Sequence, residues 1–310
     1  MPGAPKFDDA RPQPALGGGS PQRIAAVLTC FNRRQQTLDC LVALRVAVAK
    51  TSLSLQIIVV DDGSTDGTAA ALRAQDPEIT VIESGGDLFW NRGMHRGMAE
   101  AMQRPINHVL WLNDDTLLAP DALQRLLAES QAIESALGRP TIMVGATCGS
   151  DGQLTYGGSA SAGKWRCLSY HRVWHASKPV ACEVMNGNCV LLPANLVKQV
   201  GNLDPVFEHA MGDTDYALRA RRAGFGVHVA SGFVGRCANN PVHGTYSDTS
   251  LPWATRWRKV MDRKGLPWRS WFHFTRRHGG WLWPLYFAWP YCQLLVSGVF
   301  AKRSGSTGAN

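Results

Sequence analysis

Residues 55–64 decide the fold, and they read Leu55-Gln56-Ile57-Ile58-Val59-Val60-Asp61-Asp62-Gly63-Ser64. An apolar run that stops abruptly at two carboxylates is typical of a buried parallel strand that ends at the carboxyl edge of its sheet. The pattern recurs further along the chain, where Asn113-Asp114-Asp115 follows the apolar run 108–112. Ligands of open α/β sheets bind at that edge, and carboxylates gathered there can hold a divalent cation and its diphosphate. The two motifs therefore predict an enzyme that handles a nucleotide or an activated phosphate ester.

Strand-like and helix-like stretches alternate around these motifs at the lengths of βαβ units. This alternation predicts a right-handed, mostly parallel sheet flanked by helices. We expect Ser64 or Thr65 to cap the second helix and Asp121 to cap the fourth. The expected strands are 24–29, 55–60, 79–83 and 108–112, and the expected helices are 37–49, 68–75, 91–102 and 121–136.

Beyond residue 141 the regular alternation of strand-like and helix-like stretches ends. Strands are expected at 142–147, 183–192 and 227–230, with Gly187 placed where another backbone needs a close approach. A glycine- and serine-rich excursion separates the first two, over residues 151–180. A helix is expected at 213–223, ended by Gly224.

Composition points to a globular protein, because apolar residues make up 45% and charged residues 18% of the 310 residues. The first 22 residues, rich in Pro, Gly and Ala, predict a disordered leader. No basic stretch followed by an apolar core opens the chain, so no secretory signal is expected. The eight cysteines show no CxxC pair, which favours reduced core residues in a cytosolic protein.

Residues 246–310 form a basic, aromatic appendage. Between Leu251 and Gly280, eight Lys or Arg residues face one acid, and seven of the eleven tryptophans lie from Trp253 onward. This composition favours a negatively charged membrane surface or lipid-linked acceptor over nucleic acid, and the alternative is a solvated face with no partner. Residues 281–300 are apolar but interrupted by proline. A helix or hairpin lying in the membrane interface is expected, with a spanning helix or a helix packed on the enzyme as alternatives.

A third acidic cluster, Gly212-Asp213-Thr214-Asp215-Tyr216, opens the helix at 213–223. An unpaired carboxylate close to a reacting carbon can deprotonate an acceptor hydroxyl, whereas a paired one only complements the helix N-terminus. Arg219 or Arg222 on the same helix can balance a diphosphate or face solvent. Trp90, Trp165 and Trp174 can stack on sugar rings or pack in the core.

Taken together, these motifs resemble glycosyltransferase family 2 over residues 23–245. The resemblance implies a GT-A fold, with a Rossmann-like nucleotide-binding half at 23–118 and an acceptor half at 119–245. It also implies inversion at the anomeric carbon by direct displacement, with Mg²⁺ or Mn²⁺ on the diphosphate. The motifs that carry it, in the family's order, are Ala26-Val27-Leu28-Thr29-Cys30-Phe31-Asn32-Arg33, Val59 to Thr68, Leu112 to Asp115, and Gly212 to Tyr216 with Arg219 and Gly224.

Residue roles follow from the matched motifs. Asp115, with Asp114 beside it, matches the metal-binding acid, and Asp213 matches the catalytic base, with Asp215 as the alternative. Asp61 and Asp62 match the turn that reads base and ribose. The remaining donor-binding residues implied are Thr29, Phe31, Asn32, Arg33, Asn91 and Arg92, and those implied for the acceptor or the diphosphate are Trp90, Gly187, Arg219, Arg222 and Arg236.

Three positions depart from the family's pattern. Asn113 stands where the first metal-binding acid is usual, and Gly212 stands where an acid precedes the base. A metal-binding histidine is often found after the last core strand, but this chain reads Val234-Gly235-Arg236-Cys237-Ala238 there. Either His243 substitutes as a ligand or Arg236 neutralises charge without binding metal.

The expected activity is transfer of a hexose from a UDP- or dTDP-sugar to a cell-surface polysaccharide or lipid-linked glycan, at the cytoplasmic face of the cell membrane. The loop 86–91 and the tryptophan-rich tail resemble the bacterial rhamnosyl- and galactofuranosyltransferases of the family. A sugar-phosphate nucleotidyltransferase is one alternative, although residues 29–33 lack the glycine-rich loop it would need. A non-catalytic nucleotide-sugar binding protein is the other.

Overall fold

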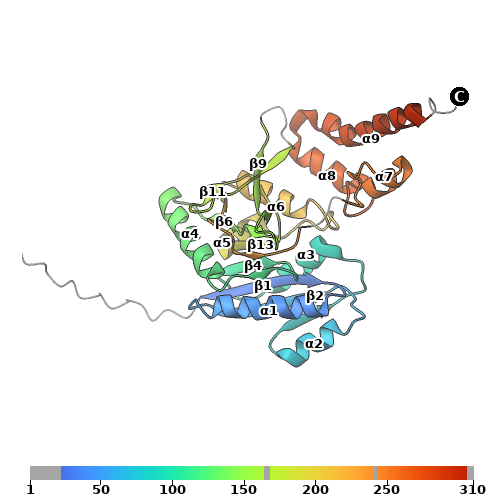
Figure 1. Ribbon diagram of the computed structural model, residues 1–310. Helices are drawn as coiled ribbons and strands as arrows, with labels where there is room; N and C mark the ends of the chain where they lie inside the picture. Colours follow the sequence, from blue (N-terminus) through green and yellow to red (C-terminus); the bar gives the residue numbers. More distant parts are fainter. Residues whose placement is uncertain (1–21, 164–167, 240–242, 306–310) are drawn as a thin grey trace, which may run out of the picture.

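The computed structural model describes residues 22–163, 168–239 and 243–305, and the side chains of the last helix up to residue 296. Figure 1 shows an α/β body with a helical appendage at one end. Nearly all of the predicted leader, residues 1–22, lies outside the described residues.

The body is built on an eight-stranded sheet. Its pairs β1/β2, β2/β3, β1/β4 and β6/β14 are parallel, while β13 runs antiparallel to both β4 and β6 and β11 runs antiparallel to β14. This arrangement confirms the predicted mostly parallel α/β sheet. In spatial order the strands are β11 (Val180–Ala181), β14 (Gly226–Val229), β6 (Thr141–Val144), β13 (Cys189–Pro193), β4 (His108–Leu112), β1 (Arg23–Cys30), β2 (Ser54–Asp61) and β3 (Thr80–Glu83).

Helices cover both faces of this sheet. One apolar core lies between the sheet and α1 (Arg34–Val48), α2 (Thr68–Gln75) and α4 (Ala122–Leu137). The other lies between the sheet and α3 (Phe89–Ala101), α5 (Ala194–Val200) and α6 (Gly212–Arg222), with Trp111 of β4 fully buried in it. The chain folds this way because β1, β2 and β4 are apolar on both faces, so each face needs its own layer of helices.

Two predicted strands are each broken in two. The run 183–192 forms β12 (Val184–Met185) and β13, which belong to different sheets, and the run 142–147 forms β6 and β7 (Thr147–Cys148). The break at 186–188 turns the backbone N–H of Gly187 toward Asp213 instead of toward a neighbouring strand. The small sheets also contain β5 (Leu117–Leu118), β8 (Leu154–Tyr156), β9 (Gly158–Ser161), β10 (Tyr170–Val173) and β15 (Gly235–Arg236).

Both predicted helix caps are wrong. Asp66, and neither Ser64 nor Thr65, accepts the Thr68 N–H at the start of α2, at 3.1 Å. Ser64 Oγ instead accepts the Asn32 N–H at 2.9 Å, because the turn that follows β1 lies beside the turn that follows β2. The carboxylate of Asp121 pairs with Arg125 one turn along α4 rather than with the backbone.

The appendage consists of α7 (Trp253–Val260), α8 (Trp268–His278), the short helix η1 (Gly280–Leu282) and α9 (Trp283–Gly305). Phe272 of α8 meets the rings of Trp283 and Phe287 on α9 edge-on. Phe274 of α8 meets Phe207, so the appendage packs against the segment that leads into α6. In the part of the chain that the structure describes, no helix is both long enough and apolar enough to cross a membrane.

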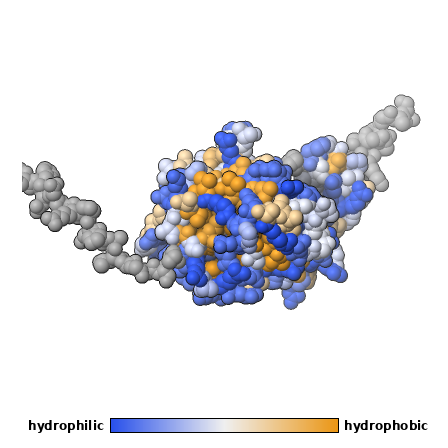
Figure 2. Space-filling view, turned by 90° about the horizontal axis from the view of Figure 1, so that it is seen from below, coloured by the Kyte–Doolittle hydropathy of each residue, from blue (hydrophilic) through white to orange (hydrophobic). Residues whose placement is uncertain are grey.

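Apolar side chains are also exposed on the α/β body. Figure 2 shows them gathered on the underside of the molecule among polar ones. On α1, Val42 is 51% exposed and Val46 is 45% exposed.

Candidate active site

The parallel strands β1, β2 and β4 end side by side, and their last residues bring the first two acidic motifs together. Cys30 at the end of β1 is in register with Asp61 at the end of β2. Arg33, three residues beyond β1, donates to Asp114 Oδ1 at 3.1 Å and to Asp115 Oδ2 at 2.9 Å. The second acidic turn is thus tied to the end of β1, and the first acidic turn follows β2 next to it.

Asp62 is committed to the loop that follows β3. Its carboxylate accepts the N–H groups of Leu88 at 3.1 Å and Phe89 at 2.8 Å, as well as the hydroxyl of Ser84 at 2.8 Å. Asp62 thus holds the start of α3, and its predicted role in reading the base or ribose stays a prediction. Asp61 is also buried and accepts the Ser64 N–H at 2.9 Å, which shapes the turn.

Asn91 and Arg92 contact the segment 204–208, and their predicted part in binding the donor stays a prediction. Asn91 is fully buried, and its amide donates to the carbonyl oxygens of Asp204 at 2.8 Å and Phe207 at 2.7 Å. Arg92 Nε donates to the carbonyl of Pro205 at 3.0 Å. Both side chains point from α3 toward the segment 204–208 and hold it in place.

The pair Asp114 and Asp115 could hold a metal ion. Burial raises the pKa of Asp114 to about 6 against the opposing charge of Arg33, while the Asp115 side chain is 33% exposed. No cluster of three or more His, Cys, Asp or Glu side chains suited to a metal occurs among the described residues. Two carboxylates beside one arginine still fit a cation that takes most of its ligands from a diphosphate, which is how Mg²⁺ usually binds.

Cys237 is a site residue that the sequence analysis did not single out. It follows β15, which pairs with β5 just beyond Asp115, and its thiol donates to Asp115 Oδ1 at 3.4 Å. Burial and the nearby Asp115 raise the pKa of Cys237 to about 11, so the thiol stays protonated. The only signal in the sequence was its position where a metal-binding histidine is common.

Two further predicted residues are His243, the possible metal ligand, and Arg236, which was expected to neutralise charge if His243 does not bind the metal. His243 is 86% exposed, and its ring pairs with Asp248 at 3.1 Å rather than with Asp115, so the structure gives it no part in the metal site. Arg236 is exposed on β15 and in register with Leu117, close along the chain to Asp115.

Asp213 lies in the first turn of α6 and is joined to the acidic turns by a chain of contacts. Its Oδ2 accepts the Gly187 N–H at 3.0 Å, and its Oδ1 accepts the Thr214 N–H at 2.7 Å. A side chain at Gly187 would lie 2.2 Å from the Trp90 ring, and the Trp90 indole donates to Asn113 Oδ1 at 2.8 Å. Burial raises the pKa of Asp213, which makes it a better proton acceptor than an ordinary aspartate.

Gly212 lacks the acid that is usual before the base because no side chain fits there. A Cβ atom at this position would lie 1.7 Å from Asn91 Oδ1. The buried Asn91 amide occupies that space while it holds the segment 204–208. The departure from the family's pattern is thus explained by packing.

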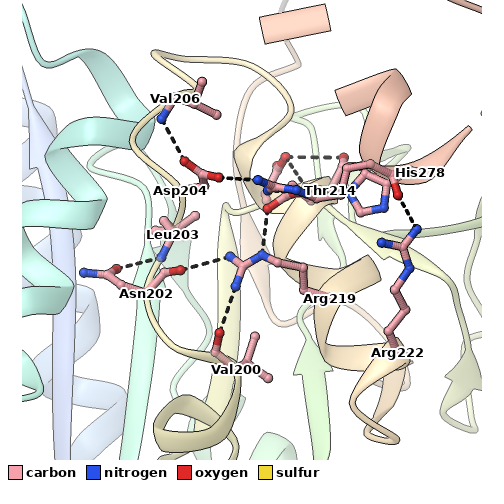
Figure 3. A network of polar contacts seen from close by, with 12 residues as sticks. Val200, Asn202, Leu203, Asp204, Val206, Thr214, Arg219, Arg222 and His278 are labelled. Atoms are coloured by element: carbon pink, nitrogen blue, oxygen red, sulfur yellow. Dashed lines mark hydrogen bonds and ion pairs between the residues drawn. The ribbon is translucent and has the colours of Figure 1, made fainter. Parts of the chain in front are cut away.

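Asp215, the alternative base, is fully buried, and two arginines and a histidine surround its carboxylate. Figure 3 labels two of these three partners, Arg219 and His278. Arg219 donates to its Oδ2, and Arg277 and His278 Nε2 lie against its Oδ1, each at 2.8 Å. Burial alone would raise the pKa of Asp215, but the hydrogen bonds from His278, Arg219 and Arg277 lower it to about 2. A carboxylate held in this way is a poor base, so the structure argues against the alternative assignment.

Arg219 and Arg222 make contacts in the same region, and their predicted role at the diphosphate stays a prediction. Arg219 also donates to the carbonyls of Val200 and Asn202, each at 2.9 Å. Arg222 donates to the carbonyl of Arg277 at 2.6 Å (Figure 3). Arg236, also predicted for the acceptor or the diphosphate, is exposed, and Arg33, predicted to bind the donor, lies against Asp114 and Asp115.

The aromatic residues that were predicted to bind the base or a sugar ring have different surroundings in the structure. Trp174 stacks on Phe233 with ring centroids 4.4 Å apart and donates to the Gly232 carbonyl, so it packs in the core. Trp165 lies outside the described residues. Phe31 is 52% exposed at the end of β1, and the Thr29 hydroxyl is buried with no hydrogen-bond partner in the structure.

Backbone strain gathers at the site. Among the described residues, only Asn32, Phe89 and Met211 combine a side chain with a positive φ, at 50°, 57° and 74°. They lie in the turn after β1, at the start of α3 and just before α6. Such conformations persist where the surroundings enforce them, which is commonly at functional sites.

Comparisons with known proteins agree with this geometry. Residues 25–144 match the sequence model of the family described as Glycosyl transferase family 2. The chain is 32% identical over 124 residues to an N-acetylglucosaminyltransferase of Mesorhizobium japonicum, a match that covers 37% of this chain and 28% of that protein. It is 22% identical over 254 residues to the N-acetylglucosaminyl-diphospho-decaprenol L-rhamnosyltransferase of Mycobacterium tuberculosis, covering 73% of this chain and 81% of that protein.

The fold is shared with a solved glycosyltransferase. The mannosyltransferase from Pyrobaculum calidifontis, in complex with GDP-Man and Mn²⁺, superposes with a TM-score of 0.54 and 16% sequence identity, covering 96% of this chain and 80% of that one. This likeness confirms the expected GT-A architecture. Residues 25–144 thus form a domain similar to those of glycosyltransferase family 2, and the fold of the chain agrees with that similarity.

Proposed function

We propose that this protein is an inverting, metal-dependent hexosyltransferase that uses a nucleotide-diphospho-sugar. The observation that carries the proposal is the contact chain from Asp213 through Gly187 and Trp90 to Asn113, beside Asp114 and Asp115. The proton acceptor Asp213 and the residues proposed for the diphosphate are thereby held on two sides of one active site, as an in-line displacement needs.

Asp213 acts as the general base. Its carboxylate takes the proton of the acceptor hydroxyl while the hydroxyl oxygen attacks the anomeric carbon on the face opposite the leaving diphosphate, which inverts that centre. The N–H groups of Gly187 and Thr214 hold the carboxylate in position. The raised pKa of Asp213 strengthens it as a base.

Asp115 and Asp114 would hold the divalent cation, Mg²⁺ or Mn²⁺, which when bound neutralises charge on the leaving diphosphate. Arg33, already between the two carboxylates, and the exposed Arg236 supply further positive charge to the diphosphate. UDP- and dTDP-hexoses are the donors to test first.

The acceptor we propose is a lipid-linked glycan, and the site of action is the cytoplasmic surface of the cell membrane. The similarity to a rhamnosyltransferase named for a decaprenol-linked acceptor supports this choice. The basic, tryptophan-rich appendage of this chain supports it independently.

The test compares Asp213→Asn with Asp39→Asn, which alters an exposed acid on α1. Release of nucleoside diphosphate with Mn²⁺ and a panel of uridine, thymidine and guanosine sugars is measured alongside donor binding. We expect Asp213→Asn to lower kcat by about 10²- to 10⁴-fold with donor affinity unchanged, and Asp39→Asn to behave as wild type. Near-normal turnover by Asp213→Asn would remove the base assignment.

Two outcomes of the same assay would favour the other functions. A protein that binds donor but releases no nucleoside diphosphate with any acceptor is a binding protein. Formation of a nucleotide-sugar with release of pyrophosphate would indicate a nucleotidyltransferase.

A further inference from the structure

The last two helical segments, η1 and α9, carry an unusual run of sequence. From Gly279 to Ala301 no residue carries a charge. One side of α9 packs inside the appendage, where the Tyr291 hydroxyl donates to the Leu266 carbonyl at 2.7 Å. On the same side, Trp253 donates from α7 to the carbonyl of Leu294 at 2.8 Å. The inner side of α9 is therefore fixed against its neighbours.

The other side of this run is exposed although it is apolar. Trp281 is 86% exposed, Leu285 66%, Trp289 62% and Val296 54%. These residues recur at intervals of four and seven, so they form one stripe, which we call the outer stripe of α9. Proteins that work free in water rarely expose a continuous apolar surface of this kind.

Basic residues accompany the outer stripe. On α8, which packs along α9 (Figure 1), the exposed side chains Arg269, His273 and Arg276 recur at intervals of four and three and share one face. Arg269 also lies over the ring of Trp268, which is itself 55% exposed. Tryptophan and arginine together suit the headgroup region of a bilayer, where the ring meets the acyl boundary and the cation meets a phosphate.

We propose that the outer stripe of α9 and the basic face of α8 bind the surface of a bilayer that contains anionic lipids. Because its inner side is packed on α7 and α8, α9 meets the bilayer side-on, with its exposed tryptophans at headgroup depth. This inference deepens the proposed function, since it names the surface in which the lipid-linked acceptor is presented.

The test uses the full chain and vesicles of phosphatidylcholine, with and without phosphatidylglycerol, in a sedimentation assay at low and high salt. Wild type should bind only the anionic vesicles and should release at high salt. Trp281→Ser with Leu285→Ser and Trp289→Ser should weaken binding about a hundredfold or more. Arg269→Gln with Arg276→Gln should weaken it about 30-fold. The matched control, Val42→Ser with Val46→Ser, removes exposed apolar side chains from α1 and should bind as wild type.

Wild type that stays in the supernatant with anionic vesicles would overturn the proposal, as would a stripe variant that binds normally. So would a stripe variant that changes the protein from dimer to monomer in light scattering, because the stripe would then join two copies of the chain. Donor turnover with a water-soluble acceptor is measured on the same variants and should not change. If vesicles are not bound but turnover is intact, the membrane-binding proposal fails and the proposed function is unaffected. If vesicles are bound but no donor is turned over, the proposed function fails and the membrane-binding proposal is unaffected.

A second inference rests on a different observation, the contacts that α8 makes with the segment 204–215. Arg277 donates to Asp215 Oδ1 at 2.8 Å and to Asp204 Oδ2 at 2.6 Å. Earlier in the appendage, Arg263 donates to Glu208 at 2.6 Å and lies over the Phe89 ring at 4.2 Å. The appendage thus forms ion pairs along the segment 204–215, which leads into α6 and includes its first turn.

We infer that Arg277 is a positioning residue for Asp213. The two residues are linked through Asp215, which Arg277 contacts and which shares the first turn of α6 with Asp213. Without Arg277, the first turn of α6 is free to shift, and Asp213 loses its alignment with Gly187. This inference rests on the proposed role of Asp213 as the base.

Its test compares Arg277→Ala, Arg277→Lys and Arg258→Ala, the last an exposed arginine on α7. We expect Arg277→Ala to lower kcat about tenfold or more while the KM for the donor stays constant, because orientation is lost and binding is not. Arg277→Lys should recover part of that loss and Arg258→Ala should show none. An unchanged kcat in Arg277→Ala would overturn the inference if Asp213→Asn is inactive. If Asp213→Asn is active, the proposed function fails instead.

Discussion

The contact between Gly187 and Trp90 links the two halves of the candidate site, and adding one methyl group at Gly187 tests it. In Gly187→Ala the new Cβ would lie 2.2 Å from Cζ2 and 2.4 Å from Cη2 of the indole, far inside ordinary contact distance. The ring has to move by more than an ångström or the turn 186–188 has to open. Overpacking of this kind costs about 1–3 kcal/mol, and loss of the hydrogen bond from the Trp90 indole to Asn113 adds about 1 kcal/mol.

We therefore expect Gly187→Ala to lower the free energy of unfolding by about 2–4 kcal/mol, measured by urea unfolding followed through tryptophan fluorescence. Because the Gly187 N–H holds Asp213, kcat should fall as well, by about ten- to a hundredfold. Gly85→Ala is the matched control, since a Cβ there meets nothing within 4 Å and needs no unusual φ. That control should unfold at or slightly above the wild-type urea midpoint.

A double mutant sharpens the test. Trp90→Phe removes the benzo ring atoms that a methyl group at Gly187 would strike, so the two changes together should cost less than the sum of the separate costs. Purely additive free energies of unfolding would refute the argument, because they would mean that the methyl group and the indole do not compete for space. Wild-type stability and turnover in Gly187→Ala would refute it directly.

Three further results are expected. The pKa of Asp215 is lowered to about 2, against an ordinary 3.8, and this shift contributes about 2 kcal/mol to the free energy of unfolding. The contribution is complete above pH 4 and is lost as the pH falls through 2. Unfolding of wild type measured across this pH range should show the loss, and unfolding of Asp215→Asn should not. Asp115→Ala should abolish the rise in melting temperature that Mn²⁺ gives in the presence of UDP, and Asp121→Ala should keep it. The raised pKa of Asp213 places the acidic limb of kcat/KM above the pH at which an ordinary aspartate titrates, because the base works only when ionised; a limb at or below that pH would contradict the assignment.

The strands that build the site were predictable from the sequence because each is encoded locally. β1, β2 and β4 are apolar runs that end at turn residues, and adjacency in a βαβ sheet then follows from connection rules. That Arg33, just beyond β1, reaches Asp114 and Asp115 beyond β4 follows from this topology. The positions of the residues at the strand ends can thus be predicted well from the sequence.

Contacts between distant segments were not predictable, because no local pattern encodes them. Asp62 was expected to serve the donor, yet its partners Leu88 and Phe89 lie in a loop whose path only the packed fold defines. Arg219 was expected near the diphosphate for its charge alone, but the carbonyls of Val200 and Asn202 take up its guanidinium. In both cases the residue type was correctly seen as important, and its partner was a backbone group that leaves no trace in the sequence.

The choice between Asp213 and Asp215 shows most clearly what the fold adds. Residues two apart on a helix point to opposite sides, so one carboxylate faces Gly187 in the site and the other faces α8. Burial acts on both, but Asp213 meets only neutral donors, and its pKa rises, whereas Asp215 meets three cationic or ionisable partners, and its pKa falls. Two of those partners, Arg277 and His278, lie in the appendage, 62 and 63 residues further along the chain. Contacts from α8 thus lower the pKa of Asp215 and not that of Asp213, and for that reason a motif confined to residues 212–216 left both acids open.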